Sequence, residues 1–401
     1  MHTRKTVNRS AILAIASVMA VSATVNAETI RIATWNIEAD INGVTTPRAG
    51  LNSVLEGIGE DNFDGSSVPL DVLALQETTS NGTTVAPIVT ALNSFYSQSA
   101  LVSKYGTNVY AQSSVQGGQS GSNSSGNGPN AVVYNSSVLT LLSSIGVGTP
   151  QGGTNGEYRQ VMLYEFQAVG GPASSDFYVF DSHYKSGTTS TDKTDRNDEA
   201  QIIRNYEAAN LPSNARVIYT GDYNGDSDTD TAFETITSPT YTAQGQGVDP
   251  IANIADSLPG EGGYWSNNTV DQKQGLFTES VSTGMRYRDD MQIQTSNVAT
   301  DQAGGLGWVN GAYQAFGNNG SMAVGATGTG TSTPLAYLPS TEPGDGEPDS
   351  SDVLSALDTA SDHLPMLADY TLPVPEPASL GLVTLGAAGL LLRRRNPKTK
   401  R

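Results

Sequence analysis

The sequence contains no cysteine among its 401 residues, and it contains only three histidines. Without cysteine there can be no disulfide, thiolate metal site or cysteine nucleophile, so a bound metal must be held by carboxylate, amide or imidazole groups. Basic residues are also scarce, with 21 Lys and Arg against 40 Asp and Glu. Because 37% of the residues are hydrophobic and only 15% are charged, the composition excludes a disordered chain and indicates one large or two small globular domains.

The first 27 residues are typical of a secretory signal peptide. Three basic residues near the start precede an apolar run at residues 11–21, and the small-residue exit Val25-Asn26-Ala27 follows. The apolar run is much shorter than the roughly 20 residues that a membrane-spanning helix needs. Cleavage before Glu28 is therefore favoured over a membrane anchor at this end.

The C-terminal segment, residues 373–401, combines three features in a fixed order. Val374-Pro375-Glu376-Pro377 leads into an almost wholly apolar stretch, Leu380 to Leu392, and then into Arg393-Arg394-Arg395. The arginines would stay in the cytoplasm by the positive-inside rule, so a short transmembrane helix would hold the chain transiently in the inner membrane. This order resembles the PEP-CTERM sorting signal of bacteria. The resemblance implies recognition by an exosortase-type protease and delivery to the cell surface or the exterior, with permanent anchoring through the tail as the alternative.

Between these two ends the chain is strongly acidic. Nine of the 21 basic residues lie in the signal segment or beyond Pro377, and neither stretch contains an Asp or Glu, so the rest of the chain has 12 basic residues against 40 acidic ones and a net charge of about −28. Such a body repels polyanions at long range. If it binds nucleic acid, it must do so through a local site and divalent cations rather than through a broad basic surface.

Four apolar segments alternate with the two-residue period of β-strands. They lie at residues 30–37, 71–77, 177–183 and 216–222, and near their ends stand Asn36, Glu77, His183 and Asp222. In the second segment Leu73, Leu75 and Glu77 are expected to share one face. Each strand therefore ends in a residue that can bind a metal or move a proton.

Helical spacing lies between these strands, at residues 85–96 and at residues 200–209 after a cap at Asp192 or Thr194. The mixture predicts an α/β fold with one catalytic domain at residues 28–372. Sites in such folds gather where strand ends open into loops. Stretches rich in Gly, Ser and Asn at residues 116–130 and 317–334 are expected to be surface loops.

The body contains only two histidines, His183 and His363. A lone histidine is more often structural, but each of these stands beside acidic residues. The segment GDYN at 221–224 has the composition of a turn, although it would also place Asp222 and Asn224 together at a strand end. The acidic run that follows lacks the glycine and glutamate spacing of an EF-hand calcium loop.

Six segments occur in the order typical of one superfamily. They are ATWNI at 33–37, LQE at 75–77, SHYKSG at 182–187, GDYN at 221–224, RDDM at 288–291 and SDHLP at 361–365. In this respect the body, from Ile30 to Tyr370, resembles the endonuclease/exonuclease/phosphatase superfamily. The resemblance implies a DNase I-like four-layer α/β sandwich, two mixed β-sheets flanked by helices, with the site at one end of the sheets.

The resemblance also implies a metal site. Glu77 would be the main ligand of a catalytic Mg²⁺, with Mn²⁺ or Ca²⁺ as alternatives, and Asn36 and Asp362 would assist directly or through water. Oxygen ligands and a retained water shell suit Mg²⁺.

Five further residues would carry the chemistry, as the resemblance implies. Asp222 would orient or deprotonate the attacking water, and Asn224 would hold the phosphoryl group or that water. His183 and His363 would donate hydrogen bonds or a proton, and Asp290 would pair with His363. The acid that precedes it, Asp289, stands where the superfamily has an apolar residue and could compete for the same histidine.

Three functions fit these observations. The first is a secreted or surface-delivered metal-dependent phosphodiesterase, most simply a nuclease acting on extracellular nucleic acid. The second is a sphingomyelinase-like or small phosphate-ester hydrolase, and the third is a non-catalytic surface or matrix binding protein. Lys185, Arg196 and Arg204 are candidate phosphate contacts, although a solvent-exposed helix face would explain the two arginines equally well.

Overall fold

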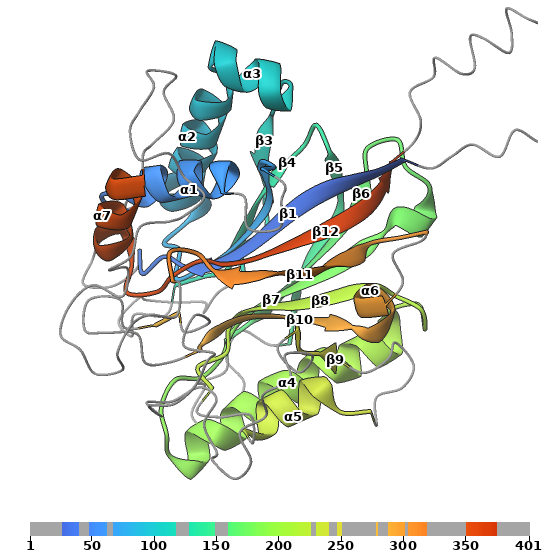
Figure 1. Ribbon diagram of the computed structural model, residues 1–401. Coiled ribbons are helices and arrows are strands. Elements are labelled where there is room, and N and C mark those ends of the chain that lie inside the picture. Colours follow the sequence, from blue (N-terminus) through green and yellow to red (C-terminus); the bar gives the residue numbers. More distant parts are fainter. Residues whose placement is uncertain are drawn as a thin grey trace, which may run out of the picture. The chain divides into compact units, whose positions relative to one another are not determined.

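Two six-stranded β-sheets form the body of the protein in this computed structural model (Figure 1). The residues that the structure describes are 26–39, 48–61, 67–117, 128–148, 159–225, 230–239, 247–250, 278–279, 288–300, 304–318 and 350–374. Residues 1–25 of the signal segment expected at 1–27 lie outside them, as do residues 375–401 of the tail expected at 373–401. Asn26 and Ala27 belong to the first strand of the structure, and residues 373 and 374 belong to its last strand. Most of the loops expected at 116–130 and 317–334 also lie outside them.

The first sheet consists of β1 (Asn26–Asn36), β2 (Leu70–Gln76), β3 (Tyr110–Gln112), β4 (Ala131–Asn135), β11 (Gly307–Ala315) and β12 (Met366–Val374). The second sheet consists of β5 (Leu139–Val147), β6 (Val161–Ala168), β7 (Phe177–His183), β8 (Val217–Asp222), β9 (Gly247–Val248) and β10 (Asp290–Thr295). Their orders are β11-β12-β1-β2-β4-β3 and β5-β6-β7-β8-β10-β9. Both sheets are mixed, because β1 pairs with β2 and β7 pairs with β8 in parallel, whereas β2 with β4 and β10 with β8 are antiparallel pairs.

Helices cover the outer faces of both sheets. They are α1 (Leu51–Glu60), α2 (Ala86–Tyr96), α3 (Ser99–Tyr105), α4 (Ser190–Asn210), α5 (Thr231–Thr237), α6 (Ser296–Thr300) and α7 (Ser350–Ala360), with a short π-helix η2 (Asn81–Val85) and a 3-10 turn η3 (Ala173–Ser175). Figure 1 shows α1, α2 and α7 over the first sheet and α4 and α5 over the second. No helix among these described segments is long and apolar enough to cross a membrane. The tail helix expected at residues 380–392 falls outside them.

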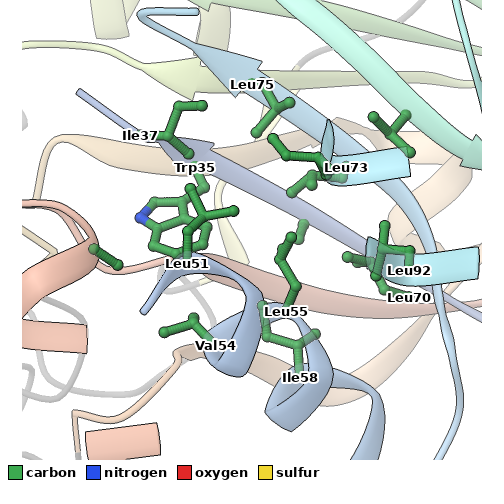
Figure 2. Packing of buried hydrophobic residues seen from close by; sticks show 14 of the residues in the cluster. Trp35, Ile37, Leu51, Val54, Leu55, Ile58, Leu70, Leu73, Leu75 and Leu92 are labelled. Atoms are coloured by element: carbon green, nitrogen blue, oxygen red, sulfur yellow. The ribbon is translucent and has the colours of Figure 1, made fainter. Parts of the chain in front are cut away.

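Three buried clusters separate four layers. The central cluster joins the inner faces of the sheets through residues such as Ile32, Phe177 and Ile218. A second cluster, around Trp35 and Leu55, packs the first sheet against α1, α2 and α7 (Figure 2), and a third packs the second sheet against α4 and α5. The apolar alternation of the strands places one set of side chains in each cluster. The four-layer α/β sandwich expected from the sequence is confirmed.

The long helix α4 begins earlier than the sequence predicted. Its N-cap is Thr189, whose hydroxyl accepts a hydrogen bond from the Asp192 N–H at 3.2 Å, while the Asp192 carboxylate accepts one from the Thr189 N–H at 3.0 Å. This capping box satisfies two backbone donors at once. The predicted cap at Asp192 or Thr194 was therefore wrong by three or more residues, because Asp192 serves as the third residue of the box.

Gly221 lies where strands β7 and β8 approach most closely. It has φ 129°, and a Cβ atom there would run into the backbone carbonyl of Ser182, its register partner on β7. We expect Gly221→Ala to destabilise the fold by about 3 kcal/mol or more, because neither backbone can move without disturbing the sheet. Urea unfolding checks this, with Gly82→Ala as the matched control, since nothing lies within 4 Å of a Cβ at that position.

Candidate active site

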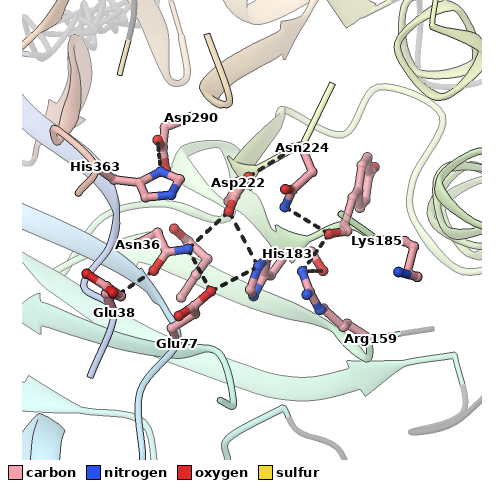
Figure 3. A network of polar contacts seen from close by, with 12 residues as sticks. Asn36, Glu38, Glu77, Arg159, His183, Lys185, Asp222, Asn224, Asp290 and His363 are labelled. Carbon is pink, nitrogen blue, oxygen red and sulfur yellow. Dashed lines mark hydrogen bonds and ion pairs between the residues drawn. The ribbon is translucent and has the colours of Figure 1, made fainter. Parts of the chain in front are cut away.

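The ends of five strands meet at one edge of the sandwich (Figure 3). Parallel pairing of β1 with β2 and of β7 with β8 brings Asn36 beside Glu77, and His183 beside Asp222. Strand β10 runs antiparallel to β8, so its first residue, Asp290, lies opposite Asp222. Carboxyl ends of parallel strands share an edge, which explains why residues so distant in sequence come together.

Asn36 is the centre of a buried polar group. Its side-chain nitrogen donates to Glu77 Oε1 at 3.2 Å and to Asp222 Oδ2 at 3.0 Å. The Nε2 atom of His183 lies 3.5 Å from Glu77 Oε1 and 3.4 Å from Asp222 Oδ2. The Asn36 side-chain oxygen accepts a hydrogen bond from the Glu38 N–H at 3.0 Å. This bond fixes the amide with its nitrogen facing the two carboxylates. Two side chains from the first sheet and two from the second sheet thus meet at this point.

Glu77 reaches this group through an unusual backbone conformation. Leu73 and Leu75 point into the cluster beneath the helices, and simple alternation would send Glu77 the same way. Instead Glu77 has φ 55°, in the left-handed region that non-glycine residues rarely adopt. The prediction that these three side chains share one face was wrong, because this turn directs the carboxylate towards the second sheet. Glu38 and Asn224, with φ 48° and 46°, are the other non-glycine residues with positive φ in the described segments, and strain of this kind gathers at functional sites.

His363 enters the site from the segment before β12. Its Nδ1 lies 2.7 Å from Asp290 Oδ2, and its carbonyl accepts from the Trp35 indole N–H at 2.9 Å. The Ser361 hydroxyl donates to the Asn36 carbonyl at 2.7 Å, which fixes this segment against β1. The partner of His363 is therefore Asp290, and Asp289 does not take its place.

The two histidines have opposite electrostatic settings. Burial lowers the pKa of His183 to well below its usual range, and the nearby Arg159 guanidinium lowers it further. Burial also lowers the pKa of His363, but the Asp290, Asp222 and Asp362 carboxylates outweigh burial and hold the pKa well above the usual range. At neutral pH His183 is therefore neutral and His363 is cationic.

Two carboxyls of the site have raised pKa values. Burial raises the pKa of Glu77 to about 7, although Arg159 and Asn36 oppose the change. Burial likewise raises the pKa of Asp222 to about 6, with His363 opposing it and Asp290 adding to it. Without a metal ion both carboxyls therefore have pKa values close to neutral pH, which suits Asp222 as a proton acceptor.

The donor set around Glu77 fits a divalent cation. Glu77 Oε2 is buried and has no hydrogen-bond partner, which is costly for a carboxylate unless a cation or water satisfies it. A cation there would also offset the adjacent negative charges of Glu77 and Asp222. Asn36, by contrast, turns its nitrogen towards these carboxylates, so it orients Glu77 in the conformation seen.

Asp362 and Asn224 lie beside the central group rather than within it. Asp362 Oδ1 is 3.8 Å from His363 Nε2, and its carboxylate also acts on Glu38. Ligand atoms of Glu279, Asp362 and His363 lie within 4.8 Å of one another, so Glu279 adds a donor that sequence reasoning missed. Asn224 donates its backbone N–H to Asp222 Oδ1 at 2.9 Å and its side-chain nitrogen to the Tyr184 carbonyl at 3.0 Å.

Two more residues that the sequence did not reveal, Arg159 and Glu199, form hydrogen bonds that hold the segments around the site in place. Arg159 donates to the Tyr184 carbonyl at 2.6 Å, and its guanidinium acts on Glu77 and Asp222. The Glu199 carboxylate of α4 accepts from the Arg159 N–H at 2.8 Å and from the Lys185 N–H at 3.0 Å. It therefore joins the start of β6 to the loop after His183. No local pattern marks Arg159. For Glu199 the available sequence signal is its position four residues before Ile203, which places it on the apolar face of the helix.

Residues 33–276 match the model of the Endonuclease/Exonuclease/phosphatase family. The chain belongs to the endonuclease/exonuclease/phosphatase family. Members of this family are phosphoric ester hydrolases that generally use divalent metal ions. Residues 373–395 match the PEP-CTERM protein-sorting motif, which indicates export and surface anchoring in bacteria and exosortase-type processing. Both resemblances seen in the sequence are confirmed.

Solved structures of similar fold include the catalytic domain of human Nocturnin with bound sulfate, with a TM-score of 0.47, 14% identity, and coverage of 86% of this chain and 97% of that one. D. rerio TDP2 complexed with single strand DNA product has a TM-score of 0.44 and 13% identity, and the match covers 86% of this chain and 99% of that one. An endonuclease/exonuclease/phosphatase from Bacteroides vulgatus has a TM-score of 0.45 and 15% identity, and the match covers 86% of this chain and 99% of that one. Comparison with curated proteins found no match.

Proposed function

We propose that the protein is an exported, Mg²⁺-dependent phosphodiesterase that hydrolyses phosphodiester bonds of extracellular nucleic acid. The observation that carries the proposal is the convergence of Asn36, Glu77, His183 and Asp222 from four strands, beside the His363–Asp290 pair. A binding scaffold has no need to gather two buried carboxylates with raised pKa values and two histidines of opposite protonation. Family membership and the sorting motif agree with both parts of the proposal.

Each side chain has a distinct task in this proposal. A divalent cation, when bound, supplies the positive charge that offsets the charge on phosphate oxygens. Glu77 would hold the cation, and Asp362, which lies 3.8 Å from His363, would assist it directly or through water. Asn36 donates to both Glu77 and Asp222 and so fixes the two carboxylates relative to each other. Asp222, fixed by Asn36 and by the Asn224 N–H, accepts a proton from the attacking water.

The two histidines act on the phosphate oxygens. Cationic His363 donates a hydrogen bond or a proton to an oxygen of the phosphoryl or leaving group, and Asp290 fixes its orientation. Neutral His183 donates from Nε2 towards the carboxylates in the resting site and can turn this donor to a phosphate oxygen. Asn224 holds the phosphoryl group or the water from the neighbouring loop.

A substrate panel tests the proposal. Purified residues 28–372 are incubated with a chromogenic phosphodiester, DNA, RNA and sphingomyelin, each with Mg²⁺ and with EDTA. We expect metal-dependent cleavage of the chromogenic substrate and of at least one nucleic acid. Cleavage that survives chelation would contradict the metal role, and preference for sphingomyelin would move the protein to the lipid-hydrolase alternative, which the acidic body also suits. Failure to cleave any substrate would favour the non-catalytic alternative.

Glu77→Gln should change the stability of the metal-free protein in a pH-dependent way. The folded pKa of Glu77, about 7, exceeds its unfolded value, so the unfolded state ionises first and stability falls as pH rises from about 4.5 to about 7. Glutamine removes this loss, and without metal the variant should be more stable than the wild type at pH 8, by up to about 3 kcal/mol, but not at pH 4.

The same variant should lose metal stabilisation. Saturating Mn²⁺ should raise the melting temperature of the wild type more at pH 8 than at pH 5.5, because binding requires the ionised carboxylate. Glu77→Gln should show little shift at either pH. Thermal unfolding with and without metal measures both effects, and an equal metal shift in the variant would remove Glu77 from the metal site.

A further inference from the structure

The structure accounts for most of the few cations in the body, which has 12 Lys and Arg in all. Four arginines are buried in ion pairs with carboxylates inside the fold: Arg31 with Asp369, Arg196 with Asp230, Arg204 with Glu207, and Arg288 with Asp249. These groups cannot reach a substrate without unfolding their surroundings. The expectation that Arg196 and Arg204 contact phosphate is therefore wrong, since both are buried rather than on a solvent-exposed helix face.

Two partly exposed cations flank the candidate active site. Arg48 lies 2.7 Å from the carboxylate of Glu38, whose N–H donates to Asn36. Lys185 follows His183 by two residues, and its Nζ lies 3.3 Å from Asp192. Their side chains are 27% and 21% exposed. Figure 3 shows Glu38 and Lys185 on opposite sides of the Asn36 and His183 group.

Arg159 lies close to Glu77 and Asp222, but it is buried and donates to the Tyr184 carbonyl, so it belongs to the interior of the site and not to its rim. The other cations in the described residues are Lys104, Arg216 and Lys193. Lys104 binds Glu60 at the end of α1, and Arg216 precedes β8, whose other end forms the site. Lys193 lies on α4, and the sequence adds only Lys273 and Arg286 outside the described residues.

The rim also carries acids that oppose a long polyanion. Each flanking cation already has an acidic partner, Glu38 for Arg48 and Asp192 for Lys185. The side chain of Asp362, next to His363, is 45% exposed. A phosphate near the scissile one can displace an acid from Arg48 or Lys185, but phosphates farther along a strand would meet net negative charge.

We infer that the site takes short or terminal nucleotide phosphodiesters, contacting the scissile phosphate and no more than one neighbouring phosphate on each side, at Arg48 and at Lys185. This inference rests on the proposed function. It narrows the substrate from nucleic acid in general to a short oligonucleotide or the end of a single strand. The substrate class follows from the number and placement of cations around the site among the residues that the structure describes.

The salt dependence of kcat/KM tests the inference. Each phosphate contact on a single strand contributes a slope of about −0.7 in log–log plots against salt, so two contacts predict about −1.4. Raising salt from 50 to 200 mM at constant Mg²⁺ should then lower kcat/KM for oligonucleotides about sevenfold, whereas six to ten contacts on a single strand would lower it by a factor of about 300 to about 16,000. Salt can also change the rate of the chemical step. The salt dependence of kcat/KM for the chromogenic phosphodiester measures this effect and is subtracted from that for the oligonucleotides.

Substrate length and charge variants complete the test. We expect kcat/KM to stop rising beyond about four nucleotides, and circular single-stranded DNA to be cut far more slowly than the linear form. Arg48→Gln and Lys185→Gln should each flatten the salt slope by about 0.7. Lys104→Gln, on α3 beside Glu60, should leave the slope unchanged.

The contradicting outcomes are distinct from those for the proposed function. A salt effect larger than about 20-fold, continued gain with length, or rapid cutting of the circle would overturn the inference while leaving the phosphodiesterase intact. Loss of activity on the chromogenic substrate as well would instead overturn the proposed function. Release of mononucleotides from long linear strands, compared with cleavage of free tetranucleotides, distinguishes strand ends from short oligonucleotides as the substrate.

Discussion

Asp222→Asn should lower kcat for a chromogenic phosphodiester by about 10³- to 10⁴-fold while changing KM little. Asp222 is the carboxylate that Asn36 and the Asn224 N–H hold in place, and an amide cannot accept the proton of the attacking water. Asparagine retains the shape of the side chain, but its single amide oxygen can accept only one of the two hydrogen bonds that Asn36 and the Asn224 N–H donate to Asp222. Steady-state kinetics at pH 8, where the carboxyl of the wild type is ionised given its pKa of about 6, measures the loss.

Stability provides the control for this variant. Burial raises the pKa of Asp222, so asparagine should leave the metal-free protein at least as stable as the wild type at pH 8. A loss of activity accompanied by unfolding would say nothing about catalysis. A correctly folded Asp222→Asn protein with more than a tenth of wild-type kcat would show that Asp222 is not the base.

Asp290→Asn should lower kcat by about 10²- to 10³-fold and move the alkaline limb of the pH profile. Asp290 is the closest of the carboxylates that hold the pKa of His363 above its usual range. Activity that needs the cationic histidine is lost as pH rises through this pKa. Without the Asp290 carboxylate the pKa falls, so activity should disappear at a lower pH than in the wild type.

Asp289→Asn is the matched control for Asp290→Asn. Burial and the nearby Glu279 carboxylate raise the pKa of Asp289 well above its usual range, which favours the uncharged form of this side chain. Asparagine then changes neither charge nor shape appreciably, and the pH profile should keep its position. If Asp289→Asn moved the alkaline limb and Asp290→Asn did not, the assignment of the histidine partner would be reversed.

The strand pattern predicted much of the fold, because alternation identifies buried strands without reference to their partners. Asn36, His183 and Asp222 could be predicted as site residues since each ends a strand in phase with apolar side chains. Glu77 was assigned to the site but to the wrong face. A single positive φ reverses its direction, and alternation carries no information about such a turn.

Long-range pairing explains the other errors. Arg196 is buried in an ion pair with Asp230, which lies 34 residues farther along the chain. Arg204 pairs with Glu207 on the same helix, and its guanidinium also donates to the Tyr219 hydroxyl of β8. The role of Glu199 depends on two backbone N–H groups, of Arg159 and Lys185, that meet only in the folded chain. Local sequence cannot show such contacts, since burial of a charge depends on the partner that compensates it.

The position of the metal tests the central claim most directly. Crystals of residues 28–372 grown with Mn²⁺ can be measured at the manganese absorption edge, where anomalous scattering locates the ion independently of the atomic coordinates. We expect a peak at the Glu77 carboxylate, on the side of Oε2, close to Asp222 and His363. A fully occupied peak elsewhere, with none at Glu77, would contradict the assignment of these strand ends as one catalytic centre.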